Sequence, residues 1–152
     1  MTPIFNTREH AHCAEFVEAW VELRLALWPD ATEQEHRAEI AAQLAEPSRY
    51  GAFVVMMAGQ SAGLAEVALR RDYVNGTDTS PVAFLEGIYV TASHRRTGVA
   101  RMLLDAVRGW ARLHRCTELA SDTALDNIVS QAAHQALGFT ETERVVFYRM
   151  LL

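Results

Sequence analysis

A mixed α/β fold is predicted by the order of apolar patterns along this chain of 152 residues. Two apolar runs, at 52–57 and 62–69, are separated by a short turn and indicate an antiparallel hairpin. A strand pattern at 82–90 is followed by helical spacing at 98–114 and a short strand at 118–122. Because a helix joins these last two strands, we expect them to be parallel neighbours in the sheet.

The other elements have start and stop signals of their own. Thr32 and Glu35 form a capping-box pattern that begins a helix, and Pro29 ends the helix before it. Gly138 is typical of a left-handed cap after a helix. The elements predicted in this way are a strand at 4–5, helices at 11–27, 32–44 and 127–137, and a final strand at 140–150.

Length and composition indicate a single domain, 1–152, with an apolar half large enough for a real core. No run of about 18 apolar residues occurs and no secretory signal opens the chain, so we expect a cytoplasmic protein without a membrane partner. The net charge of −5 argues against nucleic acid. Cys13 and Cys116 lie far apart and are expected to be free thiols, with no metal site.

The loop 95–100 is basic, contains a glycine, and lies between a strand and a helix. The first turn of a helix has unpaired N–H groups and partial positive charge, which suits an anion. Arginine forks suit phosphate oxygens. This junction therefore predicts a site for a phosphate-bearing cofactor, with pyrophosphate as the expected guest.

The pattern Arg95-x-x-Gly98-x-Ala100 at this junction, with Leu137-Gly138-Phe139 near the end, resembles the GNAT acetyltransferases. That resemblance implies the GNAT fold, in which a mixed, mostly antiparallel sheet has a splayed parallel pair and helices on both faces. It also implies acetyl-CoA as cofactor. Further stretches are similar to bacterial aminoglycoside 6'-N-acetyltransferases, which acetylate the 6'-amine of these antibiotics and are often dimeric. These stretches are Trp28-Pro29, 71–76, 84–88, 120–123, 134–139 and 143–145.

The resemblance assigns cofactor contacts to three places. The strand end would pair with the pantetheine amides, although it would equally be an ordinary central strand. The loop and helix start would hold the pyrophosphate, unless they are a plain loop and cap. Asn127 would reach the pantetheine arm, unless it is only an N-cap. The strand-end residues are Ile88, Tyr89 and Val90. The residues of the loop and helix start are Arg96, Thr97, Gly98, Val99, Ala100 and Arg101.

Three carboxylates and two aromatic residues are the candidates for the acceptor site. An aminoglycoside is polycationic, so its pocket should present carboxylates and amphipathic rings. Glu86 lies in mid-strand, which is costly for a lone charge, and is expected to bind the amine or take its proton. A half-exposed position or an ion pair with an arginine would also explain it. The remaining candidates are Asp122, Glu143, Trp28 and Tyr73, each of which has a surface or packing alternative.

The residues leave several candidates for the general acid. Many GNAT enzymes have a tyrosine four residues before the glycine of the Gly-Phe pair, and here that position is His134. A histidine can donate a proton near neutral pH, but it can also simply pack beside the cofactor. Tyr148 and solvent are the alternatives. Glu86, Asp122 and His134 are thus the catalytic candidates for direct acetyl transfer, with backbone N–H groups at 88–90 near the thioester carbonyl.

Two other functions remain open at this point. The chain could acetylate another amine, such as a polyamine or a protein N-terminus, because an acidic pocket suits these as well. It could also be a non-catalytic acyl-CoA-binding module. The final strand at 140–150 could pair or exchange across the interface of a homodimer.

Overall fold

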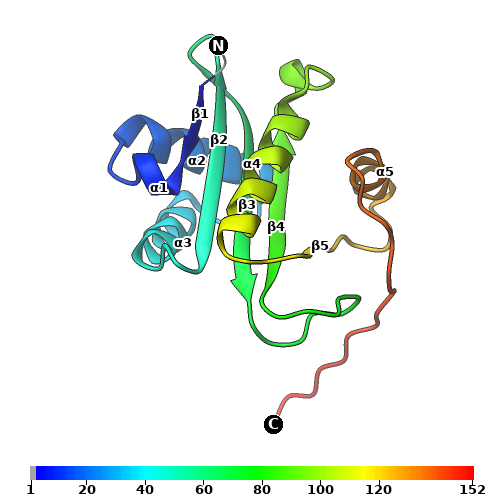
Figure 1. Ribbon diagram of the computed structural model, residues 1–152. Helices are drawn as coiled ribbons and strands as arrows, with labels where there is room; N and C mark the ends of the chain where they lie inside the picture. Colours follow the sequence, from blue (N-terminus) through cyan, green and yellow to red (C-terminus); the bar gives the residue numbers. More distant parts are fainter. Residues whose placement is uncertain (1–2) are drawn as a thin grey trace.

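The computed structural model describes residues 3–152 and has a five-stranded sheet at its centre (Figure 1). Neighbouring strands pair antiparallel from β1 to β4, whereas β4 and β5 are parallel. The mixed sheet and its parallel pair confirm the sequence prediction. The strands, in their order across the sheet, are β1 (Ile4–Asn6), β2 (Tyr50–Met57), β3 (Gln60–Arg70), β4 (Val82–Val90) and β5 (Leu119–Ser121).

Helices cover both faces of this sheet, as the resemblance implied (Figure 1). On one face, Leu103 and Val107 of α4 pack into an apolar core with β2, β3 and β4. On the other face, Phe16 and Trp20 of α2 pack on β2 and β3, and α3 lies against α2. The helical elements are α1 (Thr7–His10), α2 (Ala14–Leu27), α3 (Glu33–Ala45), the one-turn η1 (Ala92–His94), α4 (Val99–Leu113) and α5 (Ile128–Ala136).

The first helical segment differs from the prediction of one helix at 11–27. Asn6 caps a separate short helix, α1, by accepting a hydrogen bond from the Glu9 N–H at 3.0 Å. The backbone at Cys13 is extended, with φ −83° and ψ 114°, so the chain leaves helical geometry before α2 begins. The capping box of Thr32 and Glu35 is present as predicted at the start of α3.

The predicted strand at 140–150 is wrong for the single chain. Residues 140–152 form no strand, are exposed throughout, and run away from the sheet after α5 (Figure 1). A strand needs a partner for its N–H and C=O groups, and this segment has none within the described residues, 3–152. The turn at Gly138, with φ 100°, sends the chain outward.

Among residues 3–152, no helix is long and apolar enough to cross a membrane.

Candidate active site

The two parallel strands separate halfway along β4. β5 pairs only with Ala83, Phe84 and Leu85, whereas β3 pairs with β4 as far as Val90. Beyond Leu85, the backbone edge of β4 that faces away from β3 therefore has no partner strand within residues 3–152. The predicted cofactor residues Ile88, Tyr89 and Val90 lie on this edge and are half-buried. Such an edge can accept an extended, amide-bearing ligand in the manner of an added strand.

The predicted anion site lies just beyond this edge, at the start of α4. Gly98 is the N-cap, with φ 88° and ψ 0°, a left-handed conformation that favours glycine. The first backbone bond of the helix joins the Met102 N–H to the Gly98 carbonyl at 3.0 Å. The N–H groups of Val99, Ala100 and Arg101 precede this bond and have no helical acceptor. The side chains of Arg96, Thr97 and Arg101 are exposed around them.

Asn127 is the N-cap of α5, as one of the two sequence interpretations had it. Its Oδ1 accepts a hydrogen bond from the Ser130 N–H at 3.0 Å. The side-chain oxygen is therefore committed to the helix, and a ligand would meet the amide nitrogen instead. Asn127 itself is exposed, which leaves its amide within reach of solvent.

Glu86 is the extra residue of a β-bulge. Glu66 pairs with Gly87 and Val67 pairs with Leu85, so Glu86 has no register partner on β3. Bulges of this kind re-aim a side chain and recur beside active sites. The carboxylate is 33% exposed and accepts from Nη2 of Arg70 at 2.8 Å and 3.1 Å. The bulge thus places a partly accessible carboxylate at the point where β4 and β5 separate.

A cavity of about 550 Å³ adjoins Glu86 on the face covered by α2 and α3. Trp28, directly after α2, forms part of its wall. A Cβ at Gly87 would lie 2.6 Å from Cζ2 of Trp28, so the indole packs closely on the bulged strand. The cavity is lined by Arg24, Trp28, Ala31, His36, Glu39, Gln43, Tyr50, Glu66, Val67 and Glu86. Three of these ten residues are glutamates, which suits a cationic guest.

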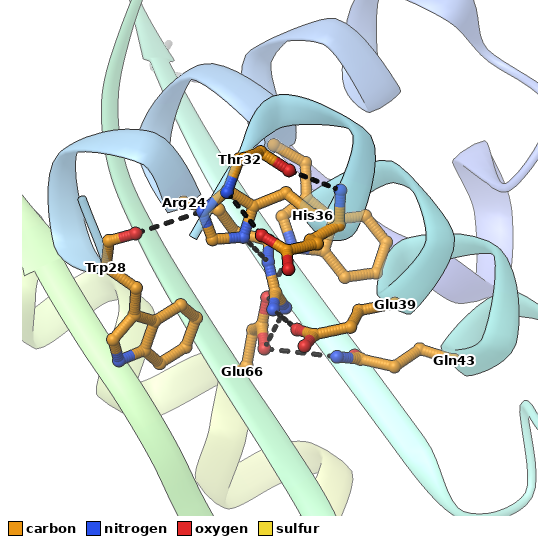
Figure 2. Close-up of polar contacts among 9 residues, drawn as sticks. Arg24, Trp28, Thr32, His36, Glu39, Gln43 and Glu66 are labelled. Atoms are coloured by element: carbon orange, nitrogen blue, oxygen red, sulfur yellow. Dashed lines mark hydrogen bonds and ion pairs between the residues drawn. The ribbon is translucent and has the colours of Figure 1, made fainter. Parts of the chain in front are cut away.

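Part of the cavity wall belongs to a buried polar network that joins α2, α3 and β3 (Figure 2). Nη1 of Arg24 donates to Glu66 at 2.6 Å and 2.9 Å, and Nε1 of Trp20 donates to the same carboxylate at 2.6 Å. Nε of Arg24 donates to Nδ1 of His36 at 3.1 Å. The other ring nitrogen of His36 lies 3.0 Å from the Trp28 carbonyl, so the network fixes the end of α2.

Sequence reasoning missed this network, although a signal for it exists. Glu66 stands in an apolar strand pattern between Ala65 and Val67. Arg24 lies four residues after Trp20 and therefore on the apolar face of the same helix. An acidic and a basic residue at two such positions predict a buried ion pair, because either charge alone would be costly.

The other acceptor candidates lie outside this cavity. Asp122 comes one residue after the register partner of Leu85, so the strand register puts it level with Glu86. Glu143 accepts from Nδ2 of Asn75 at 3.2 Å, which brings it to the exposed loop that holds Tyr73. Of the predicted substrate residues, the cavity wall includes Trp28 and Glu86 but not Tyr73, Asp122 or Glu143. The predicted substrate residues thus form two groups, one in the cavity wall and one outside it.

His134 is engaged at both ring nitrogens. Nδ1 lies 2.7 Å from the Ser130 carbonyl, and Nε2 lies 2.8 Å from Oγ of Ser121. A carbonyl can only accept, so Nδ1 carries a proton, while Nε2 shares a hydrogen bond with the Ser121 hydroxyl, which also donates to the Leu85 carbonyl at 3.3 Å. This arrangement ties α5 to β5. The alternative donor, Tyr148, is 92% exposed on the segment 140–152.

Two shifted pKa values lie near these elements. The carboxylate of Glu118 accepts from the Thr79 hydroxyl and from the Asp78 N–H, and these bonds lower its pKa. Burial raises the pKa of the Cys116 thiol. Both Cys116 and Cys13 are free thiols, as predicted.

Comparison with known proteins gives one consistent result. The model of the Acetyltransferase (GNAT) family matches residues 14–139. The aminoglycoside N(6')-acetyltransferase type 1 of Serratia marcescens is 52% identical over 136 residues, which cover 90% of this chain and 93% of that protein. The protein of the same name from Salmonella enteritidis is 47% identical, covering 88% of this chain and 91% of its own.

Two solved structures are similar over the whole chain. AAC(6')-Iy in complex with the bisubstrate analog CoA-S-monomethyl-acetylneamine superimposes with a TM-score of 0.89 at 42% identity, covering 100% of this chain and 99% of that one. The apo aminoglycoside 6'-N-acetyltransferase AAC(6')-IG from Acinetobacter haemolyticus has a TM-score of 0.90 at 42% identity, with 99% of each chain covered.

Proposed function

This chain belongs to the GNAT acetyltransferase family, and on that premise we propose that it acetylates the 6'-amine of aminoglycoside antibiotics with acetyl-CoA. The relatives that share about half of its residues bear that activity in their names. The observation that carries the proposal is the placement of Glu86, which lies between an acidic cavity and an open strand edge. The strand edge suits the cofactor and the cavity suits a polycationic acceptor.

The cofactor site is proposed to run along β4 and end at α4. The free N–H groups of Val99, Ala100 and Arg101 would hold the pyrophosphate, with Arg96, Thr97 and Gly98 around it. Ile88, Tyr89 and Val90 would pair with the pantetheine amides, and Asn127 would approach the same arm. Acetyl-CoA supplies the activated acetyl group when it is bound. A backbone N–H of this strand would then stabilise charge on the carbonyl oxygen.

The acceptor site is proposed to centre on Glu86. Its carboxylate would bind the reacting ammonium and take its proton, directly or through a water. Trp28 would offer a stacking face to a sugar ring, while Tyr73, Asp122 and Glu143 would contact the rest of the substrate. Because His134 already bonds Ser121 and Ser130, an acid role for it would require exchange of the Ser121 contact for the departing thiolate.

The decisive experiment is mass spectrometry of tobramycin after incubation with the protein and acetyl-CoA. One added acetyl group on the 6'-nitrogen is expected. Acetylation of spermidine but not tobramycin would instead indicate a polyamine enzyme. Binding of acetyl-CoA without thiol release from any amine would indicate a cofactor-binding module. Initial rates with both substrates varied should intersect, because parallel lines would mean a covalent acyl-enzyme.

The role of Glu86 is tested by Glu86→Gln. The amide keeps the shape of the side chain but neither neutralises an ammonium nor accepts its proton. We expect kcat/KM for tobramycin to fall by about 10²-fold or more. Glu15→Gln, an exposed substitution of the same kind on α2, should leave kcat/KM unchanged. Equal values for wild type and Glu86→Gln would contradict the assignment.

We also propose that the protein works as a homodimer in which residues 140–152 of each chain add to the sheet of the other. Residues 145–152 of this segment are mostly apolar and exposed, and β5 ends the sheet with a free edge. An edge strand next to an unpaired apolar segment favours such an exchange. We further propose that the protein acts in the cytoplasm, where acetyl-CoA is available to it.

A further inference from the structure

Among residues 3–152, Glu86 bonds through its side chain to Arg70, which the proposed function leaves without a role. Arg70 ends β3, and its Nη2 lies 2.8 Å from Oε1 and 3.1 Å from Oε2 of Glu86. Its guanidinium carbon lies 3.5 Å above the centre of the Phe84 ring. The stacking and the ion pair together hold a positive charge in a fixed place beside the carboxylate.

This ion pair does not use up the carboxylate. The two oxygens accept from the same nitrogen atom of Arg70, whereas an ionised carboxylate offers about four acceptor positions. The Glu86 side chain is 33% exposed, so a second donor can reach it. A substrate ammonium bound to Glu86 would therefore share the carboxylate with the guanidinium of Arg70.

The other charged and titratable groups near Glu86 come from several elements. α2 provides Arg24, α3 provides His36 and Glu39, and β3 provides Glu66, all in the wall of the same cavity. Arg24 is neutralised by ion pairs with Glu39 and Glu66, and His36 is bonded to Arg24 and the Trp28 carbonyl. Tyr50 adds a phenol from β2. Beyond the cavity, Asp122 follows β5 level with Glu86. Within residues 3–152, Arg70 is the cation paired with Glu86 itself.

An acidic site creates a chemical difficulty for acetyl transfer. Carboxylates stabilise the ammonium form of the acceptor and raise its pKa, which improves binding. Only the neutral amine has a lone pair for attack, so the same carboxylates lower the fraction of reactive substrate. A nearby positive charge has the opposite effect on the ammonium.

We propose that Arg70 is a positioning residue that fixes Glu86 and lowers the pKa of the bound substrate amine. The proposal rests on the proposed function, in which Glu86 binds that amine. The ammonium first gives a proton to water. The neutral nitrogen then forms the bond to the acetyl carbon as the carbon–sulfur bond breaks. The thiolate of coenzyme A leaves with the electron pair, and the second proton of the nitrogen passes through water to that thiolate. Because a nearby cation lowers the pKa of the ammonium, Arg70 makes the release of the first proton to water more favourable.

The test is Arg70→Gln, assayed for tobramycin acetylation between pH 6 and 9. Loss of the cation should leave KM equal or lower, because the ammonium no longer shares Glu86 with a like charge. It should lower kcat at pH 7 by roughly tenfold and raise the apparent pKa of the kcat profile by about one unit, since one unit is a tenfold change in the neutral fraction. The rate should recover toward wild type at pH 9.

Two further variants separate charge from packing. Arg70→Lys keeps the charge and should retain a profile close to wild type. Arg71→Gln removes the same charge from the next, exposed residue, which forms no ion pair with Glu86, and should leave the profile unmoved. If Arg70→Gln lowers kcat equally at all pH values, or raises KM without moving the profile, Arg70 only packs on Phe84. A wild-type protein that releases no thiol with any aminoglycoside would overturn the proposed function instead.

Discussion

Arg24 and Glu66 pair in the interior of the molecule, where each residue is only 3% exposed. Removing two charges from water is costly, and their attraction offsets that cost only when the remaining hydrogen-bonding positions are also filled. Here Trp20, His36 and Gln43 supply these bonds (Figure 2). The pair therefore holds α2 and α3 in a defined position on β3, and with them the wall that Trp28 forms.

Loss of one partner should be far more damaging than loss of both. Glu66→Leu leaves the Arg24 charge buried with only the exposed Glu39 opposite it, and we expect the free energy of unfolding to fall by about 3–5 kcal/mol. Urea denaturation measures this value. The double variant Arg24→Met with Glu66→Leu removes both charges and should recover most of the loss. A cost below 1 kcal/mol for Glu66→Leu alone would show that water reaches the Arg24 guanidinium.

Glu86 and Arg70 show how far the sequence alone can predict a site. A lone glutamate in a strand pattern was enough to select Glu86, because a charge in such a place needs a partner. Its bulge and its bond to Arg70 depend on the register between β3 and β4, which alternation along one strand does not specify. The role of Arg70 was therefore out of reach until the two strands were paired.

At the scale of elements, the loop between β3 and β4 is anchored to the segment that precedes β5. The Glu118 carboxylate accepts from the Asp78 N–H at 2.9 Å and from the Thr79 hydroxyl. The same loop contacts Thr142, whose side chain fills the place that a Cβ at Gly76 would take. These contacts give an otherwise irregular loop a fixed place, and Tyr73 lies within it.

The anchor should weaken in acid. Hydrogen bonds from Thr79 and then Asp78 lower the pKa of Glu118 in the folded protein. The stability they contribute is fully present above the ordinary glutamate pKa and is lost as the pH falls through the lowered folded value. Thermal unfolding at pH 7 should therefore show Glu118→Gln to be less stable than wild type, and the difference should shrink toward pH 3. An equal difference at both pH values would mean that the carboxylate charge is not responsible.

Elements with local signals were predicted most closely. The capping box that begins α3 and the left-handed cap after α5 depend only on neighbouring residues, and both are present. The break between α1 and α2 depends on an extended backbone at Cys13, and no glycine or proline beside Cys13 signals this break in the sequence. The strand at 140–150 failed for a different reason, because its apolar residues do not specify a partner strand and none pairs with it among residues 3–152.

At the scale of the whole molecule, the end of the chain is the feature that a single copy leaves unexplained. Exposed apolar residues gather on residues 145–152, where Phe147 is 87% exposed, and on α5 at Ile128 and Val129. Monomeric proteins seldom expose contiguous apolar patches of this kind. The segment also runs away from its own sheet (Figure 1). In the proposed homodimer, a second copy with the same free β5 edge would satisfy both the apolar side chains and the unpaired backbone.

The exchange predicts a dimer that depends on this segment. Light scattering after size exclusion should give twice the chain mass for wild type. Phe147→Asp removes a burial of about 1.5–3 kcal/mol, and two-fold symmetry removes it twice. The dissociation constant should therefore rise at least about a hundredfold. Leu113→Asp, at an apolar residue on α4 that is also 69% exposed, should leave the dimer intact. A wild-type monomer, or equal weakening by both substitutions, would contradict the exchange, because neither result singles out residues 140–152.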